Sequence, residues 1–293
     1  MTDSETRIAP GGVVAGVDGS PNASLAAAWA ANEALLREES LTLVHALSMP
    51  NVSATEPSAD AVRARDQGRD LLDRTGEAVH ERFPDLPVDT LLSDTSPGAA
   101  LHELSTRSAL VVTGTRGHGG FPGMALGSVS RRLAAHARCP LVAVPAEMTP
   151  EKPFADVVVG IEPHQAEAPV TYAFEAAERY HAQLNAVRAW WPPRMHLPTA
   201  DASRARLGAS HSEETQDLEA LLEPFRSSYP KVDLGIMAWR GNAVPILTEA
   251  ADGSRLLVVG AHRHRGPLAV GAGYVVDGVI AHTRTPVAVV PIH

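Results

Sequence analysis

The chain has 293 residues, about twice the length of a typical domain, so two domains are expected. Its formal net charge of −9 argues against general binding to nucleic acid or to anionic membranes, because both need a basic face. A hydrophobic fraction of 44% is sufficient for full-sized cores. The single cysteine, Cys139, excludes an internal disulfide and a multi-cysteine metal site.

The start of the chain carries no targeting signal that we can identify. Residues 1–10 are polar and lack the apolar core of a signal peptide. No apolar run elsewhere approaches the roughly 18 residues that a membrane span needs. We therefore expect a soluble, cytoplasmic protein with no membrane partner.

The first half of the chain alternates short runs rich in apolar residues with helical patterns. The short runs predict strands at residues 12–17, 41–47, 88–92, 109–113 and 141–144. The helical patterns fall between them, at residues 21–39, 61–83, 98–105 and 128–136. Residues 48–60, rich in Ser, Pro, Asn and Thr, predict a loop. Strands that alternate with helices are typical of an α/β domain with a parallel sheet.

The second half repeats this pattern. Its apolar runs lie at residues 157–161, 186–189, 256–260 and 286–291. The offset is 144 from Asp18 to Glu162 and 146 from Gly114 to Gly260, so the spacing is kept across a whole domain. A duplication is the economical explanation. It predicts two tandem domains, residues 1–148 and 149–293, joined by the polar, proline-bearing linker 147–153.

The most informative stretch lies between the fourth predicted strand and the next predicted helix. It reads Gly114-Thr115-Arg116-Gly117, then nine residues, then Gly127-Ser128-Val129. We expect the glycines at its two ends to adopt positive φ and to let the backbone approach a ligand. The first N–H groups of the following helix have no intrahelical partner and favour an anion, above all a phosphate. Taken alone, the stretch is equally well explained as a surface loop whose helix is capped by Ser128.

Together with Gly16-Val17-Asp18-Gly19-Ser20-Pro21 after the first predicted strand, this spacing resembles the universal stress protein family in its tandem-domain form. The resemblance covers nearly the whole chain. It implies two doubly wound, Rossmann-like α/β domains, each with a five-stranded parallel sheet in the order 3-2-1-4-5. In such a sheet the first and fourth strands are neighbours where the order reverses, and open α/β sheets bind ligands in the crevice at that point.

The resemblance also implies an ATP-binding site in the first domain, with ATP alone or with Mg²⁺, or a related adenine nucleotide, as the ligand. Asp18 and backbone atoms at Ala46 would serve the adenine and ribose end. Asp18 on its own is better explained as a helix cap, but the glycine loop reverses that preference. The residues that the resemblance assigns to the nucleotide are Gly16, Asp18, Ala46, Thr113, Gly114, Gly117, Gly127, Ser128 and Val129.

The second half has lost part of this signature. The offset of 146 places Arg263 at the position of Gly117 and Tyr274 at that of Ser128. We expect Arg263 to fill the phosphate cradle and the bulky Tyr274 to be a poor N-cap, so that the first domain alone holds ATP. The opposite interpretation is that Arg263 and Arg265 attract another anion or a nucleotide in a shifted pose.

No catalytic set accompanies the predicted site. The two lysines, Lys152 and Lys231, do not follow a P-loop, and the chain has no G-x-S-x-G elbow. His118 in the loop and the run from His262 to Arg265 are more simply exposed loop residues than a base or a metal site. Whether the protein is an enzyme stays open, and a nucleotide-responsive regulatory module in stress or dormancy is the first hypothesis. The alternatives are a slow ATPase or phosphotransferase at the same site and a dimerisation scaffold with a vestigial pocket.

The fifth predicted strands, residues 141–144 and 287–290, are short, apolar and predicted to be sheet edges. Apolar edges are normally covered or paired. The resemblance implies that these two strands meet and join the halves as an intramolecular pseudo-dimer about an approximate two-fold axis, with a homodimer of two chains as a further level of assembly. A protein partner cannot be named from the sequence.

Overall fold

The computed structural model describes residues 11–47, 58–117, 126–148, 155–162, 167–190, 200–262 and 272–292, and for residues 200–212 the backbone alone. Most of the predicted loop 48–60 and of the linker 147–153 lies outside these ranges. His118, Arg263 and Arg265 lie outside them as well.

Strands and helices alternate in both halves, as predicted. In chain order, the first half contains β1 (Val13–Gly16), α1 (Pro21–Leu36), β2 (Leu41–Ala46), α2 (Ala59–Arg82), β3 (Val88–Ser93), α3 (Pro97–Leu104), β4 (Leu110–Gly114), α4 (Ser128–His136) and β5 (Leu141–Val144). The second half contains β6 (Val157–Gly160), α5 (Glu167–Tyr180), β7 (Leu184–Trp190), α6 (Ala200–Ser228), β8 (Leu234–Arg240), α7 (Ala243–Ala250), β9 (Leu256–His262), α8 (Tyr274–His282) and β10 (Val287–Ile292).

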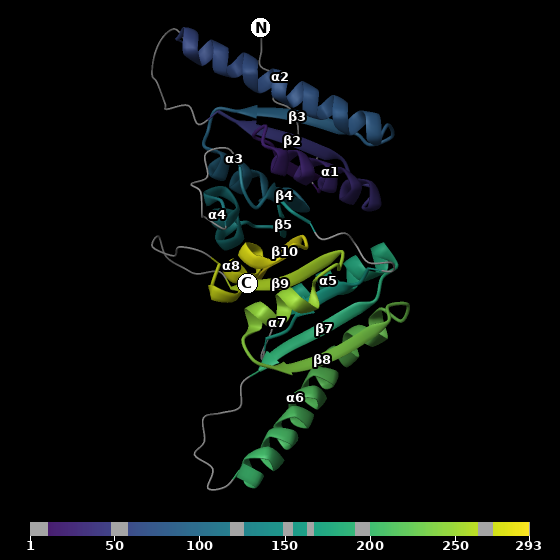
Figure 1. The fold of residues 1–293 in the computed structure, drawn as a ribbon. Coiled ribbons are helices and arrows are strands. Elements are labelled where there is room, and N and C mark those ends of the chain that lie inside the picture. Colours follow the sequence, from purple (N-terminus) through teal and green to yellow (C-terminus); the bar gives the residue numbers. More distant parts are fainter. Residues whose placement is uncertain are drawn as a thin grey trace.

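The strands form one continuous sheet in the order β3-β2-β1-β4-β5-β10-β9-β6-β7-β8 (Figure 1). Each half has the predicted order 3-2-1-4-5, and its strands are parallel. β5 and β10 pair antiparallel at the centre, with Ala143 opposite Val287 and Leu141 opposite Val289. The predicted meeting of the fifth strands is therefore confirmed, and the edges of the sheet are β3 and β8.

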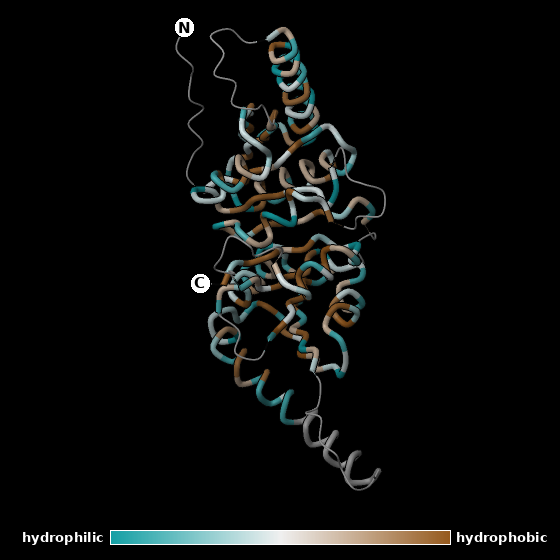
Figure 2. Tube along the Cα trace, turned by 90° about the vertical axis from the view of Figure 1, so that its left-hand side faces the viewer, coloured by the Kyte–Doolittle hydropathy of each residue, from teal (hydrophilic) through white to brown (hydrophobic). Residues whose placement is uncertain are grey.

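Helices cover both faces of the sheet. Residues of α1, α2, α5 and α6 join the core on one face, and residues of α3, α4, α7 and α8 join the core on the other. Hydrophobic segments gather in the interior of each half, and the outer helix α2, at the top of Figure 2, alternates hydrophilic and hydrophobic residues. Because both faces are covered, Val13, Val14 and Ala15 are all fully buried, which explains why the strands are continuously apolar rather than alternating.

The end of α1 differs from the prediction. α1 ends at Leu36, earlier than predicted, because Glu38 adopts a left-handed backbone conformation with φ of 56° that stops the helix.

In the described ranges, no helix combines the length and the hydrophobicity that crossing a membrane would require.

A buried cluster of charged groups connects the halves on one face of the sheet. Glu33 of α1, only 1% exposed, accepts hydrogen bonds from Arg179 at 2.8 Å and from the Tyr180 hydroxyl at 2.5 Å, both on α5. Arg37 donates to Glu33 at 2.6 Å and to the Tyr172 hydroxyl at 3.2 Å. The carboxylate is thus paired from both halves, and the cluster fixes how α1 and α5 pack against each other.

Candidate functional site

The candidate site lies at the carboxyl ends of β1 and β4. The two strands are neighbours in register, with Val13 beside Leu110. β2 lies on the other side of β1, and β5 lies on the other side of β4, so the strand order reverses between them. Asp18 follows β1 by two residues, and Gly114 is the last residue of β4. The predicted switch-point position is therefore confirmed for these two residues.

Asp18 and Gly117 lie in direct contact across this point. A methyl group built on Gly117 would overlap Oδ2 of Asp18. The other carboxylate oxygen, Oδ1, accepts a hydrogen bond from the N–H of Ser20 at 3.0 Å, which orients the carboxylate. Ser20, not Asp18, is the N-cap of α1, since its Oγ accepts from the N–H of Ala23 at 3.1 Å. The simple cap interpretation of Asp18 is therefore wrong.

The loop glycines are required for space rather than for a special backbone conformation. We expected positive φ at the ends of the loop, but Gly114 and Gly117 do not have it, and φ of Gly127 is −68°. This expectation is wrong. The physical reason for glycine is the close approach of neighbouring groups, such as the Asp18 carboxylate at Gly117.

Asn22 anchors the start of the loop to the sheet. Its Nδ2 donates to the carbonyl of Val144 at 3.0 Å, and its Oδ1 accepts from the N–H of Arg116 at 2.9 Å. A Cβ on Gly114 would lie 2.6 Å from the same Oδ1. Our sequence analysis missed Asn22. The available signal was an asparagine directly after Pro21, in the first turn of a predicted helix that is otherwise rich in alanine.

The end of the loop returns to the end of β4. The N–H of Gly127 donates to the carbonyl of Thr115 at 2.7 Å, and a Cβ on Gly127 would lie 3.2 Å from that oxygen. Ser130, which the sequence analysis also missed, donates its hydroxyl to the carbonyl of Gly114 at 2.7 Å and lies 3.2 Å from Oγ1 of Thr113. The Thr113 and Ser130 side chains are both buried, so they support the loop from below.

The start of α4 faces this loop without a capping side chain. Gly127, not Ser128, is the N-cap, and no side chain of the described residues caps the helix. Our expectation that Ser128 is the cap is therefore wrong. Ser128 is the first helical residue and is exposed, and Val129 is half-buried. The first turn holds no acidic residue, so its N–H groups retain the geometry and the positive end that favour an anion.

The remaining predicted residues lie beside these groups. Gly16 pairs in register with Val44, and a Cβ on Gly16 would lie 2.9 Å from Cδ1 of Leu101. Ala46 is half-buried at the end of β2. All the residues that the resemblance assigned are thus placed at the carboxyl ends of β1, β2 and β4 or at the start of α4.

Metal-ligating side chains do not gather here or elsewhere in the described ranges. No group of three His, Cys, Asp or Glu side chains within them is placed to hold a metal ion. His262, from the histidine-rich run of the second half, lies 3.5 Å from a carboxylate oxygen of Glu162.

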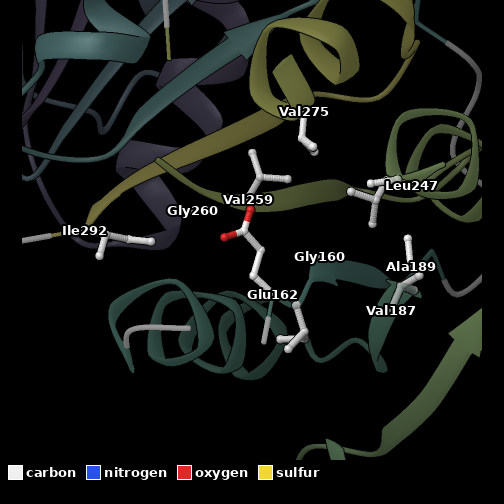
Figure 3. Close-up of a pocket in the computed structure, with 11 residues that line it drawn as sticks. Gly160, Glu162, Val187, Ala189, Leu247, Val259, Gly260, Val275 and Ile292 are labelled. Atoms are coloured by element: carbon white, nitrogen blue, oxygen red, sulfur yellow. The ribbon is translucent and has the colours of Figure 1, made fainter. Parts of the chain in front are cut away.

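The second half carries a cavity of about 260 Å³ at the equivalent position, the carboxyl ends of β6 and β9 (Figure 3). Gly160 pairs with Val187 there as Gly16 pairs with Val44 in the first half. The expectation that Arg263 fills the phosphate end concerns a residue outside the described ranges. The described part of the crevice is open.

Three polar groups beneath the first crevice have apolar counterparts in the second, whereas the Asp18 carboxylate has Glu162 as its counterpart. The offset of 146 places Val259 and Val276 where the first half has a buried threonine and a buried serine. A Cβ built on Gly260 would lie 2.7 Å from Ile292 and 3.0 Å from Pro169. At the equivalent Gly114 of the first half, the nearest group is the side-chain amide of Asn22. The backbone of the crevice is kept, but the threonine, serine and asparagine that support the first loop are replaced by apolar residues.

Tyr274 does not take the N-cap position of α8 that we expected for it. The N-cap of α8 is Gly273, with φ of 109°, and Tyr274 is the first helical residue. Its side chain is 72% exposed, and its hydroxyl accepts from Nδ2 of Asn242 at 3.3 Å. The argument that Tyr274 is a poor N-cap is therefore wrong, because it does not occupy the cap position.

The comparisons with known proteins agree on one family. The family model described as the universal stress protein family matches residues 12–145 and 153–291. A universal stress protein of Mycobacterium tuberculosis strain H37Rv is 32% identical over 287 residues, covering 95% of each chain. Another, from Mycobacterium bovis, is 29% identical over 299 residues, covering 95% of this chain and 94% of the relative.

The fold comparison points the same way. The crystal structure of a universal stress protein from Archaeoglobus fulgidus DSM 4304 matches with a TM-score of 0.69 at 14% identity, over 97% of both chains. A putative universal stress protein from Pseudomonas aeruginosa matches with a TM-score of 0.57 at 15% identity, over 97% of this chain and 94% of the other. The chain therefore belongs to the universal stress protein family, in a form with two tandem domains.

Proposed function

We propose that the protein binds ATP in the crevice of its first domain and acts as a nucleotide-responsive regulatory module in stress or dormancy. The observation that carries this proposal is the contact between Gly117 and Asp18, which leaves no room for a side chain at position 117 of the loop. A phosphate-binding loop needs such a bare backbone, because its N–H groups must reach the ligand directly. The residues present therefore fit a nucleotide.

The proposed roles follow from the position of each group. Asp18 and the backbone at Ala46 would hold the base and ribose end. The N–H groups of Ser128 and Val129 would hold the phosphates, because they start an uncapped helix with no acid in its first turn. The N–H of Gly127, which the resemblance also assigned to the phosphates, donates to the carbonyl of Thr115, so Gly127 would contribute its lack of a side chain. The ligand would be ATP with or without Mg²⁺, and the metal would be held by the phosphates rather than by a cluster of protein ligands.

A regulatory response has a physical route in this structure. Asn22 donates to the carbonyl of Val144, the last residue of β5, and accepts from Arg116 in the loop. β5 is the strand that pairs with β10 of the second half. A ligand that favours one position of the loop would therefore act on the strand pair that joins the halves.

The test is calorimetric titration of nucleotide-free protein with ATP, ADP, AMP and cyclic AMP, repeated with Gly117→Val. The valine must displace either Asp18 or the loop, so we expect ATP affinity to fall at least about tenfold, equivalent to about 1.4 kcal/mol. The matched control is Gly76→Ala in the middle of α2, where a Cβ would make an ordinary contact of 3.9 Å with Thr90. This control should keep wild-type affinity.

Circular dichroism and thermal melting would establish that both variants are folded. A folded Gly117→Val protein with wild-type ATP affinity would contradict the proposed site. A wild-type protein that binds none of the four nucleotides would contradict the proposed function and would favour a scaffold with a vestigial pocket. ADP release that saturates with ATP and disappears in Gly117→Val would instead identify a slow ATPase.

A further inference from the structure

The walls of the second-half cavity are mainly apolar. Val187 on β7, Leu247 on α7, Val259 on β9 and Val275 on α8 face the cavity from separate elements (Figure 3). Buried polar side chains support the equivalent crevice of the first half, but valines hold those positions here. The cavity therefore gains most from a ligand that buries apolar surface.

Glu162 supplies a negative charge at this cavity. Its side chain extends toward Gly260 and Val259 in Figure 3, and it is 55% exposed. One of its carboxylate oxygens lies 3.5 Å from Nε2 of His262. Gly260 is the counterpart of Gly114, the residue at which the first-half loop begins. A carboxylate accepts hydrogen bonds from hydroxyl and amino groups and repels a phosphate. The shorter Asp18 of the first half instead turns against Gly117.

The volume of the cavity limits the size of the ligand. At about 260 Å³ it lies just below the range of roughly 300–1,000 Å³ that is usual for sites of drug-sized ligands. Ala189 holds the position of Ala46 at the end of the second strand of each half, because Val187 and Val44 are the register partners of the first-strand glycines. The cavity thus keeps the framework of a base-and-ribose pocket without the polar supports of a phosphate loop.

We propose that this cavity binds a small neutral molecule of the nucleoside class, with an apolar ring and hydroxyl or amino donors, and discriminates against the phosphorylated form. Glu162 would accept hydrogen bonds from the donors, and the valine walls would cover the ring. The site and the ligand class both differ from those of the proposed ATP site. The inference rests on the proposed function only where it treats the first crevice as a base-and-ribose pocket.

Basic groups near the cavity favour an anion and so oppose this proposal. His262 lies 3.5 Å from the Glu162 carboxylate, and a protonated imidazole there would offset its charge. Arg263 and Arg265 follow β9, outside the described ranges, and their positive charges favour an anion. Adenosine and AMP share the base and the sugar and differ by one phosphate, so they separate the two interpretations. Titrating both into the full-length chain measures the preference directly.

The titrations use a reciprocal pair of variants, Ala46→Phe in the first half and Ala189→Phe in the second. In Ala46→Phe, which obstructs the first crevice, we expect one adenosine per chain and AMP binding at least about tenfold weaker. In Ala189→Phe, adenosine binding by the second half should fall more than tenfold while ATP affinity stays at the wild-type value. Ala243→Leu, at the start of α7 on another wall of the cavity, should repeat this loss if Ala189→Phe does not fold.

Glu162→Gln adds a readout of the charge itself. The amide still accepts a hydrogen bond but no longer repels phosphate, so the preference for adenosine over AMP should shrink several-fold. The inference would be overturned if Ala46→Phe bound AMP as tightly as adenosine. It would also be overturned if Ala46→Phe still bound adenosine after either Ala189→Phe or Ala243→Leu was added. Failure of the proposed function is read separately, from ATP binding to the wild type and to Gly117→Val.

Discussion

The two crevices of this protein share a backbone and differ in their side chains. In the first half, Asn22 and Ser130 hold the ends of a glycine loop against the sheet. In the second half, Pro169 and Val276 stand in their places, and the crevice is a largely apolar cavity. The comparison teaches that the parallel sheet decides where a ligand can enter, whereas a few side chains beneath the loop decide which chemistry is accepted.

The join between the halves shows the same divergence. Ala26 and Ala30 of α1 correspond to Ala173 and Ala177 of α5, so Glu33 corresponds to Tyr180. In an exact two-fold arrangement, residues near the axis meet their own copies, and two buried glutamates would repel each other. Here the carboxylate accepts a hydrogen bond from the tyrosine. Once both halves were in one chain, each could supply a different partner to the contact.

The largest expected effect comes from breaking this contact. Glu33→Ala leaves Arg37 and Arg179 without their shared buried carboxylate, so we expect the free energy of unfolding to fall by about 3–5 kcal/mol. Urea denaturation measures the change. Glu77→Ala, which removes an exposed carboxylate of α2, is the control and should stay within about 0.5 kcal/mol of the wild type. Equal effects of the two variants would show that the cluster does not hold the halves together.

An intermediate effect is expected from the loop anchor. Asn22→Ala removes the hydrogen bonds to Arg116 and to the Val144 carbonyl, so we expect a loss of about 1–3 kcal/mol in unfolding free energy. ATP affinity should fall as well, because the loop loses its tie to β5. The matched control is Pro169→Ala in the second half, which removes no side-chain hydrogen bond and should leave ATP affinity unchanged. An unchanged ATP affinity in Asn22→Ala would contradict the role of this anchor.

The smallest effect is expected from Tyr274→Ser. This change restores the residue found at the equivalent position of the first half, but Gly273 is the N-cap and the Tyr274 side chain is exposed. We expect the free energy of unfolding, followed by the thermal midpoint, to change by no more than about 0.5 kcal/mol. The second half should not gain ATP binding. A clear gain of stability would revive the interpretation that Tyr274 weakens the cap of α8.

The architecture could be predicted from the sequence because its signals are local and repeated. Continuous apolar runs such as 109–113 mark strands covered on both faces, and the duplicated spacing showed that the pattern occurs twice. The position of Asp18 beside the glycine loop followed from the strand order that the family resemblance implies. These features need no knowledge of individual contacts.

The supports of the site could not be predicted, because they depend on contacts between distant parts of the chain. Asn22 bonds to residues 94 and 122 positions away, and within α1 it looks like any polar residue near a helix start. For Gly117 we expected a positive φ and a close approach to a ligand, but its φ is not positive, and the Asp18 carboxylate occupies the space of a side chain. Such crowding becomes visible only when both strands are in place.

The central claim is that the halves are unequal and that the first alone holds ATP. The most direct test is the stoichiometry of calorimetric ATP titration in the wild type and in Gly117→Val. The account predicts one ATP per chain in the wild type and none in the folded variant. Two ATP per chain in the wild type, or one that survives in Gly117→Val, would contradict it.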